Sequence, residues 1–176
     1  MLVSIRMTVV LLIIVSGIYP LAVWAVGQLA FNHQANGSLI VRNGKVIGSE
    51  IIGQNFTSDR FFHPRPSAAG KDGYDPTASG GTNFGPTSKK LRDAIAAAVG
   101  TRRNVPADEV TASASGVDPD ISPANAYGQV PRVAKANHRS EADVRALVDR
   151  HIESRFLGIY GEPRVNVLAL NLELQR

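Results

Sequence analysis

The sequence contains no cysteine. Without a thiol, the chain can form no disulfide, hold no zinc ion through thiolates and use no cysteine nucleophile. The four histidines lie at positions 33, 63, 138 and 151, so none is four residues from another, and there is no His-Glu-x-x-His pattern. That spacing is the usual signature of a helical zinc site. We therefore expect no metal centre.

Long runs of positive charge are also absent. The chain has 19 basic and 15 acidic residues, a net charge of +4, and no basic run is longer than two residues. Proteins that bind nucleic acids usually concentrate lysine and arginine on one stripe or face. We therefore expect no nucleic-acid partner.

The common hydrolytic motifs are missing. No phosphorylatable Asp stands in a DKTG-like setting, and there is neither a P-loop lysine nor a Gly-x-Ser-x-Gly elbow. The glycine-rich residues 79–85 offer backbone amides to a phosphate but lack the P-loop ending, so a structural turn is the favoured interpretation. Asp118 and Asp120 offer carboxylates to a cation, yet turn and cap chemistry explains them better. The residues predict no catalytic site.

One long apolar segment is present. Residues 7–31 contain no Asp, Glu, Lys, Arg or His. As a helix this segment is roughly 37 Å long, more than the roughly 30 Å hydrocarbon core of a bilayer. We expect a membrane-spanning helix with its N-terminus inside and the following domain outside, kinked by Pro20. Gly17 and Gly27 leave room for close packing against partner helices, a docking hypothesis.

A cleavable secretory signal is the alternative for this segment. Val23-Trp24-Ala25 offers small residues at the positions that a signal peptidase reads. The uncharged stretch is about twice the usual length of a signal core and continues past that site, so an uncleaved anchor is favoured. The predicted organisation is a transmembrane helix over residues 1–31 and an extracytoplasmic domain over residues 32–176.

The domain begins with a hairpin signal. Residues 38–42 and 45–49 are rich in branched apolar residues, and Asn43-Gly44 between them suits a type I′ turn. Further strands are expected at 110–114 and at 164–174, where Leu168, Leu170, Leu172 and Leu174 alternate along one face.

Three helices are expected after this hairpin. They start after Thr87 or Ser88, at Ser122-Pro123 and at Ser140, each with a capping residue. Pro131 is expected to interrupt or kink the second of them. A small sheet with about three helices indicates an α+β fold.

Residues 61–66 and 70–88 are too rich in proline and glycine for regular structure. Long irregular segments of this kind are often functional, and these contain Phe61, Phe62 and Phe84. The hypothesis is that the three rings help to dock the domain on a partner. The alternative is that they pack beneath the loop.

Several motifs, in the same order along the chain, closely resemble the C subunit of the bacterial Kdp potassium-transporting P-type ATPase. They occupy residues 34–40, 52–56, 62–70, 78–86, 110–123, 129–134 and 162–172 and read QANGSLI, IGQNF, FHPRPSAAG, ASGGTNFGP, VTASASGVDPDISP, QVPRVA and EPRVNVLALNL. The resemblance covers nearly the whole chain, including the single apolar segment.

The resemblance implies a non-catalytic accessory subunit in the bacterial inner membrane. Its partners would be a potassium-selecting membrane subunit, a P-type ATP-hydrolysing subunit and membrane lipid. It would support assembly and raise the ATP affinity or turnover of the hydrolytic subunit as a catalytic chaperone, with no cofactor of its own and ATP reached through that subunit.

The resemblance also makes Gln129 a candidate nucleotide contact. An outward-facing domain would lie across the membrane from ATP, so an interior packing or capping role for Gln129 is the stronger alternative. Without the resemblance, the residues suggest an anchored or secreted periplasmic ligand-binding module.

Overall fold

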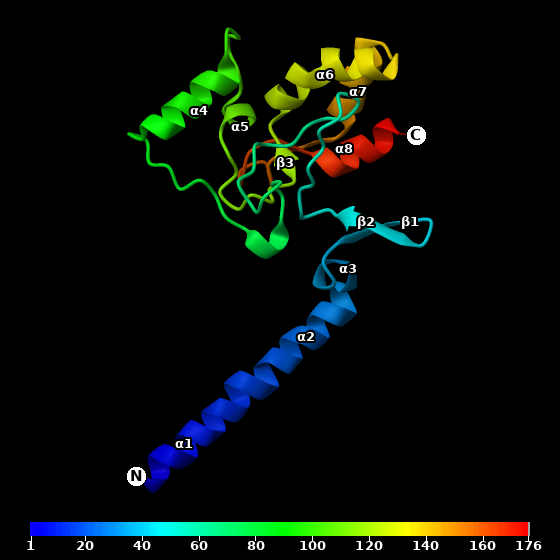
Figure 1. Cartoon of the computed structure of the whole chain (residues 1–176). Coiled ribbons are helices and arrows are strands. Elements are labelled where there is room, and N and C mark those ends of the chain that lie inside the picture. The colour runs from blue at the N-terminus through cyan, green and yellow to red at the C-terminus, as the bar shows by residue number, and fades with distance from the viewer. Residues whose placement is uncertain (176) are drawn as a thin grey trace. The chain divides into compact units, whose positions relative to one another are not determined.

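The protein has an α+β fold with an apolar N-terminal helix, as the sequence predicts. The structure, a computed structural model, describes residues 1–175. Its contacts divide the chain into two compact units, Met1–Ile47 and Gly48–Arg176, here called unit 1 and unit 2. Figure 1 shows both units and labels most of their helices and strands.

Unit 1 begins with a 29-residue helix, Leu2–Ala30, which contains an 18-residue window of mean hydropathy 2.5. It consists of α1 (Leu2–Ile13), a π-helical turn η1 (Ile14–Ile18) and α2 (Tyr19–Ala30). None of its residues is buried within the chain. By length and composition the helix can cross a membrane, and it includes Arg6, which precedes the uncharged stretch 7–31.

The π turn accommodates Pro20 without ending the helix. Pro20 lies in the first turn of α2, directly after η1, and the Tyr19 N–H reaches back to the carbonyl of Ile14. A proline has no N–H, and its ring collides with the carbonyl four residues earlier in a regular α-helix. The wider turn relieves that collision, so the backbone stays helical on both sides of Pro20.

The predicted hairpin is confirmed. After the short α3 (Asn32–Ala35), strands β1 (Leu39–Arg42) and β2 (Lys45–Ser49) form a two-stranded sheet. Asn43 and Gly44 both have positive φ, 52° and 75°, as a type I′ turn requires.

Unit 2 is built on a three-stranded antiparallel sheet with β5 (Arg164–Asn166) in the centre. Strand β3 (Asp120–Ile121) pairs with one edge of β5, and β4 (Ile152–Glu153) pairs with the other. Three helices pack with this sheet: α6 (Pro123–Asn137), α7 (Glu141–Arg150) and α8 (Val167–Leu174). Helix α7 packs between α6 and α8, and both α6 and α8 contact β5. Most of the buried core lies between these elements.

The predicted helix starts are confirmed by their caps. The hydroxyls of Ser88, Ser122 and Ser140 each accept a backbone N–H from the first turn of the helix that follows. Helix α4 (Lys89–Val99) has no buried residue, and it packs on the short α5 (Ala107–Val110). Pro131 lies inside α6, which continues to Asn137, so the expected interruption is wrong.

The strand predicted at residues 110–114 is also wrong. Val110 ends α5, and residues 111–114 form an irregular segment. This segment lies beside another irregular segment, the proline-rich residues 61–66. The Ser113 N–H donates to the carbonyl of Pro66 at 2.9 Å. Proline-rich residues offer no regular ladder of donors, so no sheet forms there.

The strand predicted at residues 164–174 ends at Asn166. The Asn166 side chain accepts the Ala169 N–H and so caps α8, which contains all four alternating leucines. Within α8, Leu168, Leu170 and Leu174 are buried. A helix buried on several sides is apolar all round, so it shows no 3.6-residue period.

Candidate functional site

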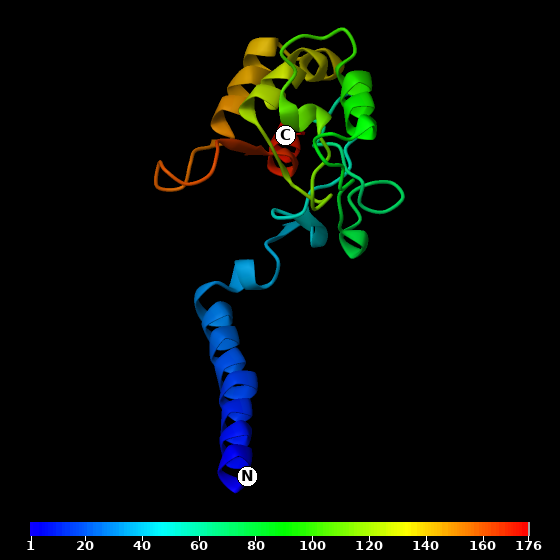
Figure 2. The same cartoon turned by 90° about the vertical axis from the view of Figure 1, so that its left-hand side faces the viewer.

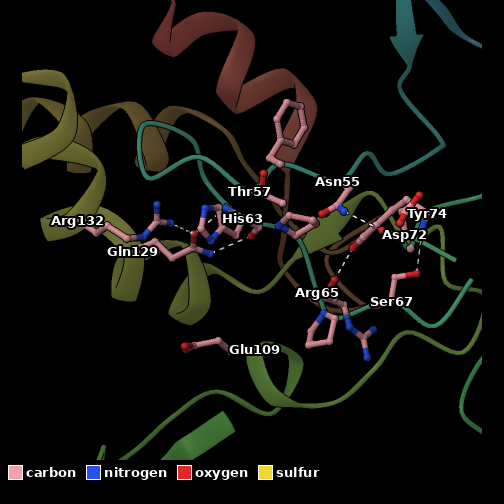
Figure 3. Close-up of a pocket in the computed structure, with 14 residues that line it drawn as sticks. Asn55, Thr57, His63, Arg65, Ser67, Asp72, Tyr74, Glu109, Gln129 and Arg132 are labelled. Atoms are coloured by element: carbon pink, nitrogen blue, oxygen red, sulfur yellow. Dashed lines mark hydrogen bonds between the residues drawn. The ribbon is translucent and has the colours of Figure 1, made fainter.

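A cavity of about 480 Å³ lies in unit 2, where the irregular residues 55–74 meet α5 and α6. Figure 3 shows its lining side chains, mostly polar, with Glu109 from α5 and Gln129 and Arg132 from α6. The lining residues are Asn55, Phe56, Thr57, His63, Pro64, Arg65, Pro66, Ser67, Asp72, Gly73, Tyr74, Glu109, Gln129 and Arg132.

The side chain of Gln129 holds the backbone of His63 at one wall of the cavity. The His63 N–H donates to Gln129 Oε1 at 2.7 Å, and Gln129 Nε2 donates to the His63 carbonyl at 3.0 Å. The primary amide therefore replaces the neighbouring strand that this extended segment lacks.

The adjacent residue, Phe62, is held in the same way from the other side. Its N–H donates to Asn171 Oδ1 at 2.8 Å, and Asn171 Nδ2 donates to its carbonyl at 3.0 Å. Asn171 belongs to α8 and is buried. Successive backbone amides of an extended chain point in opposite directions, so two helices fix two consecutive residues. We call these two residues with Gln129 and Asn171 the amide clamp.

Further hydrogen bonds hold Gln129 in place. Its Nε2 also donates to Asn125 Oδ1 at 2.8 Å, and its Oε1 accepts from Arg132 Nη2 at 2.6 Å. Asn125 is buried and donates in turn to Asp108. An amide side chain has two N–H groups and one oxygen with two lone pairs. Those of Gln129 are all engaged within the chain.

Arg132 fastens the segment that precedes the clamp. Its Nη1 donates to the carbonyls of Asp59 at 2.8 Å and Phe61 at 3.0 Å. A planar guanidinium group presents several N–H donors in a fixed geometry, so it can donate to several backbone carbonyls at once. Residues 59–63 are thus held by side chains of α6 and α8.

The opposite wall is organised by Arg65, Ser67 and Tyr74. Arg65 Nη1 pairs with Asp118 at 2.8 Å, while its buried Nε has no hydrogen-bond partner among the described residues. The Tyr74 hydroxyl donates to the Arg65 carbonyl at 2.5 Å. Burial, and then the charge of Asp118, raises the pKa of Tyr74, so the phenol stays protonated as that donor. Ser67 Oγ donates to the Gly116 carbonyl and accepts the Tyr74 N–H.

Glycine is required where the loops approach one another. Gly116 has φ +71°, and a Cβ there would lie 2.4 Å from the Cβ of Ala69 and 2.8 Å from the carbonyl oxygen of Gly80. These distances are far inside van der Waals contact. The glycine-rich segment near residue 80 thus meets other backbone directly, in line with its structural interpretation.

The cavity offers hydrogen-bonding groups more than reactive ones. Partial burial, and to a lesser extent the charge of Arg132, lowers the pKa of His63, which favours the neutral imidazole. The ring nitrogen Nε2 of His63 lies 3.1 Å from the Ser58 carbonyl. Among residues 1–175, no group of three or more His, Asp or Glu side chains is placed to hold a metal ion.

The predicted docking phenylalanines lie in different environments. Phe62 is completely buried in the core. The docking hypothesis is therefore wrong for Phe62, whose ring packs inside the domain. Phe61 is half-buried and contacts Phe56, with ring centroids 5.5 Å apart. Phe84 is 38% exposed. Of the three, Phe61 and Phe84 remain at the surface.

The two glycines of the apolar helix are both accessible. Gly17 lies in the π turn with no atom near the position of an added Cβ, while such an atom at Gly27 would contact Ala35 at 3.6 Å. The packing of the helix against partners therefore stays a hypothesis.

Sequence reasoning singled out Gln129 but missed its partner in the clamp. Asn171 stands in an apolar run, and its role depends on backbone groups 109 residues away. A buried amide inside an apolar helix is a signal in itself, because such a group needs hydrogen-bond partners.

Comparisons with known proteins match the chain over its full length. A family model described as "KdpC: K+-transporting ATPase, c chain" matches residues 1–176. Potassium-transporting ATPase KdpC subunits are similar: that of Allorhizobium ampelinum is 53% identical, covering 97% of this chain and 93% of that protein. That of Gemmatimonas aurantiaca is 55% identical (96% and 88%), and that of Mycobacterium bovis is 50% identical (98% and 96%). The chain therefore belongs to the KdpC family, the c chains of K+-transporting ATPases.

Proposed function

We propose that this chain is a non-catalytic accessory subunit of an ATP-driven, high-affinity potassium uptake complex. Its partners would be a potassium-selecting membrane subunit and a P-type ATP-hydrolysing subunit. The observation that carries the proposal is the full-length family match of a chain whose residues 2–30 form an unburied apolar helix. Such a helix needs lipid or other helices around it.

The proposed location is the bacterial inner membrane, with the N-terminus in the cytoplasm and unit 2 outside. Arg6 lies near the N-terminal end of the helix, and residues at the inner end of a first span are often basic. Docking of the span would use Gly17 and Gly27, where the absence of side chains permits close helix contact.

The proposed role is assembly, together with support of ATP affinity or turnover in the hydrolytic subunit. Gln129 would act by holding residue 63, because its hydrogen-bonding groups are already engaged within the chain. A direct contact with ATP would require these bonds to break. With these bonds intact, ATP would bind only to the hydrolytic subunit.

Deletion of residues 32–176 with the helix kept tests the proposal. We expect the partner subunits to lose complex stability and either potassium affinity or turnover. The full-length chain, purified alone, should hydrolyse no ATP. Unchanged complex recovery, potassium affinity and turnover after the deletion would contradict the accessory role.

A second candidate, binding of a small ligand, is favoured by the cavity beside the amide clamp. Purification in detergent separates the two functions. An accessory subunit should co-purify with large multispanning proteins, whereas a free ligand-binding module should be recovered alone.

A further inference from the structure

Unit 2 displays an apolar loop that neither its core nor its cavity uses. Residues 155–162, here called the tip loop, connect β4 to β5 and project from the rest of unit 2 as the orange loop in Figure 2. Four of its side chains are between 66% and 74% exposed, namely Phe156, Leu157, Ile159 and Tyr160. Single exposed apolar residues are ordinary, but four among five consecutive residues form a patch that indicates binding.

The tip loop has a defined shape. The Phe156 N–H donates to the Tyr160 carbonyl at 2.9 Å, and the Tyr160 N–H donates back at 3.0 Å. Two residues paired in this way project their side chains to the same face of a hairpin. The two aromatic side chains therefore leave the same face of the loop, and backbone hydrogen bonds fix that arrangement before any partner arrives.

Leu157 adopts a backbone conformation that does not suit leucine. Its φ is +53°, in the left-handed region, and Gly158 follows at +74°. Asparagine and glycine occupy that region at much lower cost than leucine. The turn therefore does not select leucine for its own stability, and an exposed, strained apolar residue points to a role in binding.

The charges at the base of the tip loop favour a protein partner over a lipid surface. Arg155 pairs with Glu162 at 2.6 Å, and Arg164 pairs with Glu153 at 2.8 Å and with Asp120 at 3.2 Å. Loops that rest on membranes generally add unpaired basic residues that attract anionic headgroups. An apolar centre with a rim of paired charges is instead the usual anatomy of a protein interface.

We propose that the tip loop inserts Phe156, Leu157, Ile159 and Tyr160 into an apolar groove on another subunit of the same ATPase complex. This inference rests on the proposed function and adds the surface by which unit 2 docks.

The test uses the full-length chain expressed with its partner subunits. The double variant Leu157→Asn/Ile159→Asn removes two apolar side chains and relieves the strained turn. We expect recovery of the other subunits in detergent to fall about fivefold or more. The melting temperature of the variant chain purified alone should stay equal to wild type or rise. The matched control is Ile51→Asn, which makes the same exchange at a residue that is 60% exposed, and it should retain full recovery.

A photoreactive phenylalanine in place of Phe156 identifies what the tip loop touches. We expect an adduct with another subunit. Adducts with lipid alone, or a double variant that recovers the other subunits as well as wild type does, would overturn the inference and leave the proposed function standing. If the wild-type chain recovers no other subunit, the proposed function fails and the inference fails with it.

Discussion

Gln129 and His63 are joined as neighbouring residues of a sheet are joined, although neither belongs to a strand. The His63 N–H and carbonyl both bond to one amide side chain, at 2.7 Å and 3.0 Å. Asn171 repeats the arrangement on Phe62. The proline-rich segment thus gains the order of a strand without a neighbouring strand.

Replacing Gln129 with Glu should destabilise the chain by about 1–3 kcal/mol. The carboxylate still accepts from His63 and Arg132 but donates to neither the His63 carbonyl nor Asn125 Oδ1, so two acceptors face a negative charge. Urea unfolding of the full chain in detergent measures the loss. Gln175→Glu, at an exposed residue, should cost less than about 1 kcal/mol.

The same variant separates the two roles considered for Gln129. If the side chain acts by holding residue 63, any drop in ATP affinity of the assembled complex should accompany the loss of stability. A lower ATP affinity at an unchanged urea midpoint would instead support direct contact with the nucleotide.

Gly116→Ala should destabilise unit 2 by about 2–4 kcal/mol, because the added Cβ meets Ala69 and Gly80 and because φ is +71°. Thermal unfolding of the full chain gives the measurement. Gly128→Ala is the matched control, since Gly128 is an exposed residue of α6 with open space around it. There the same change should stabilise the helix by about 0.5–1 kcal/mol. Equal effects at the two sites would contradict the close packing at Gly116.

Phe84→Ala should weaken recovery of the complex far more than it lowers the melting temperature, because the Phe84 ring is partly exposed. Phe62→Ala should do the reverse in the isolated chain and cost about 3–5 kcal/mol, because it empties a fully buried site. Detergent pull-down and thermal unfolding of both variants provide the comparison. Similar losses for Phe84→Ala in both assays would assign that ring to packing beneath the loop.

His63 should make stability depend on pH just below neutrality. Burial lowers its pKa below 6.5 in the folded chain, so the unfolded chain takes up a proton at higher pH than the folded chain. The contribution of His63 to stability is present above pH 6.5 and is lost as the pH falls through the folded pKa. Between about pH 7.5 and 5.5, wild type should lose more urea resistance than His63→Gln loses. Identical losses would remove His63 as the cause.

The sequence predicted best what depends on neighbouring residues. The turn at Asn43-Gly44 and the helix starts at Ser88, Ser122 and Ser140 are local, since a capping side chain and its target lie within three residues. These signals hold wherever the element is placed in the fold.

The parts that depend on distant contacts were missed. Leu168, Leu170 and Leu174 alternate like a strand, yet they lie on α8, where burial from several sides erases the helical period. Likewise, nothing near Gln129 in the sequence indicates that its target is the backbone of residue 63. Every residue has the same backbone groups, so no sequence motif indicates which of them a distant side chain will bond.

The amide clamp also constrains the order in which the chain folds. Phe62 bonds to Asn171, 109 residues further along, and Asn171 lies in the last helix. During synthesis the segment around Phe62 emerges early but must wait for nearly the whole chain before its backbone is satisfied. Contacts of such long range slow folding. Until α8 arrives, the nascent domain exposes an unpaired extended segment, so even a short C-terminal truncation would leave the N-terminal half without a finished fold.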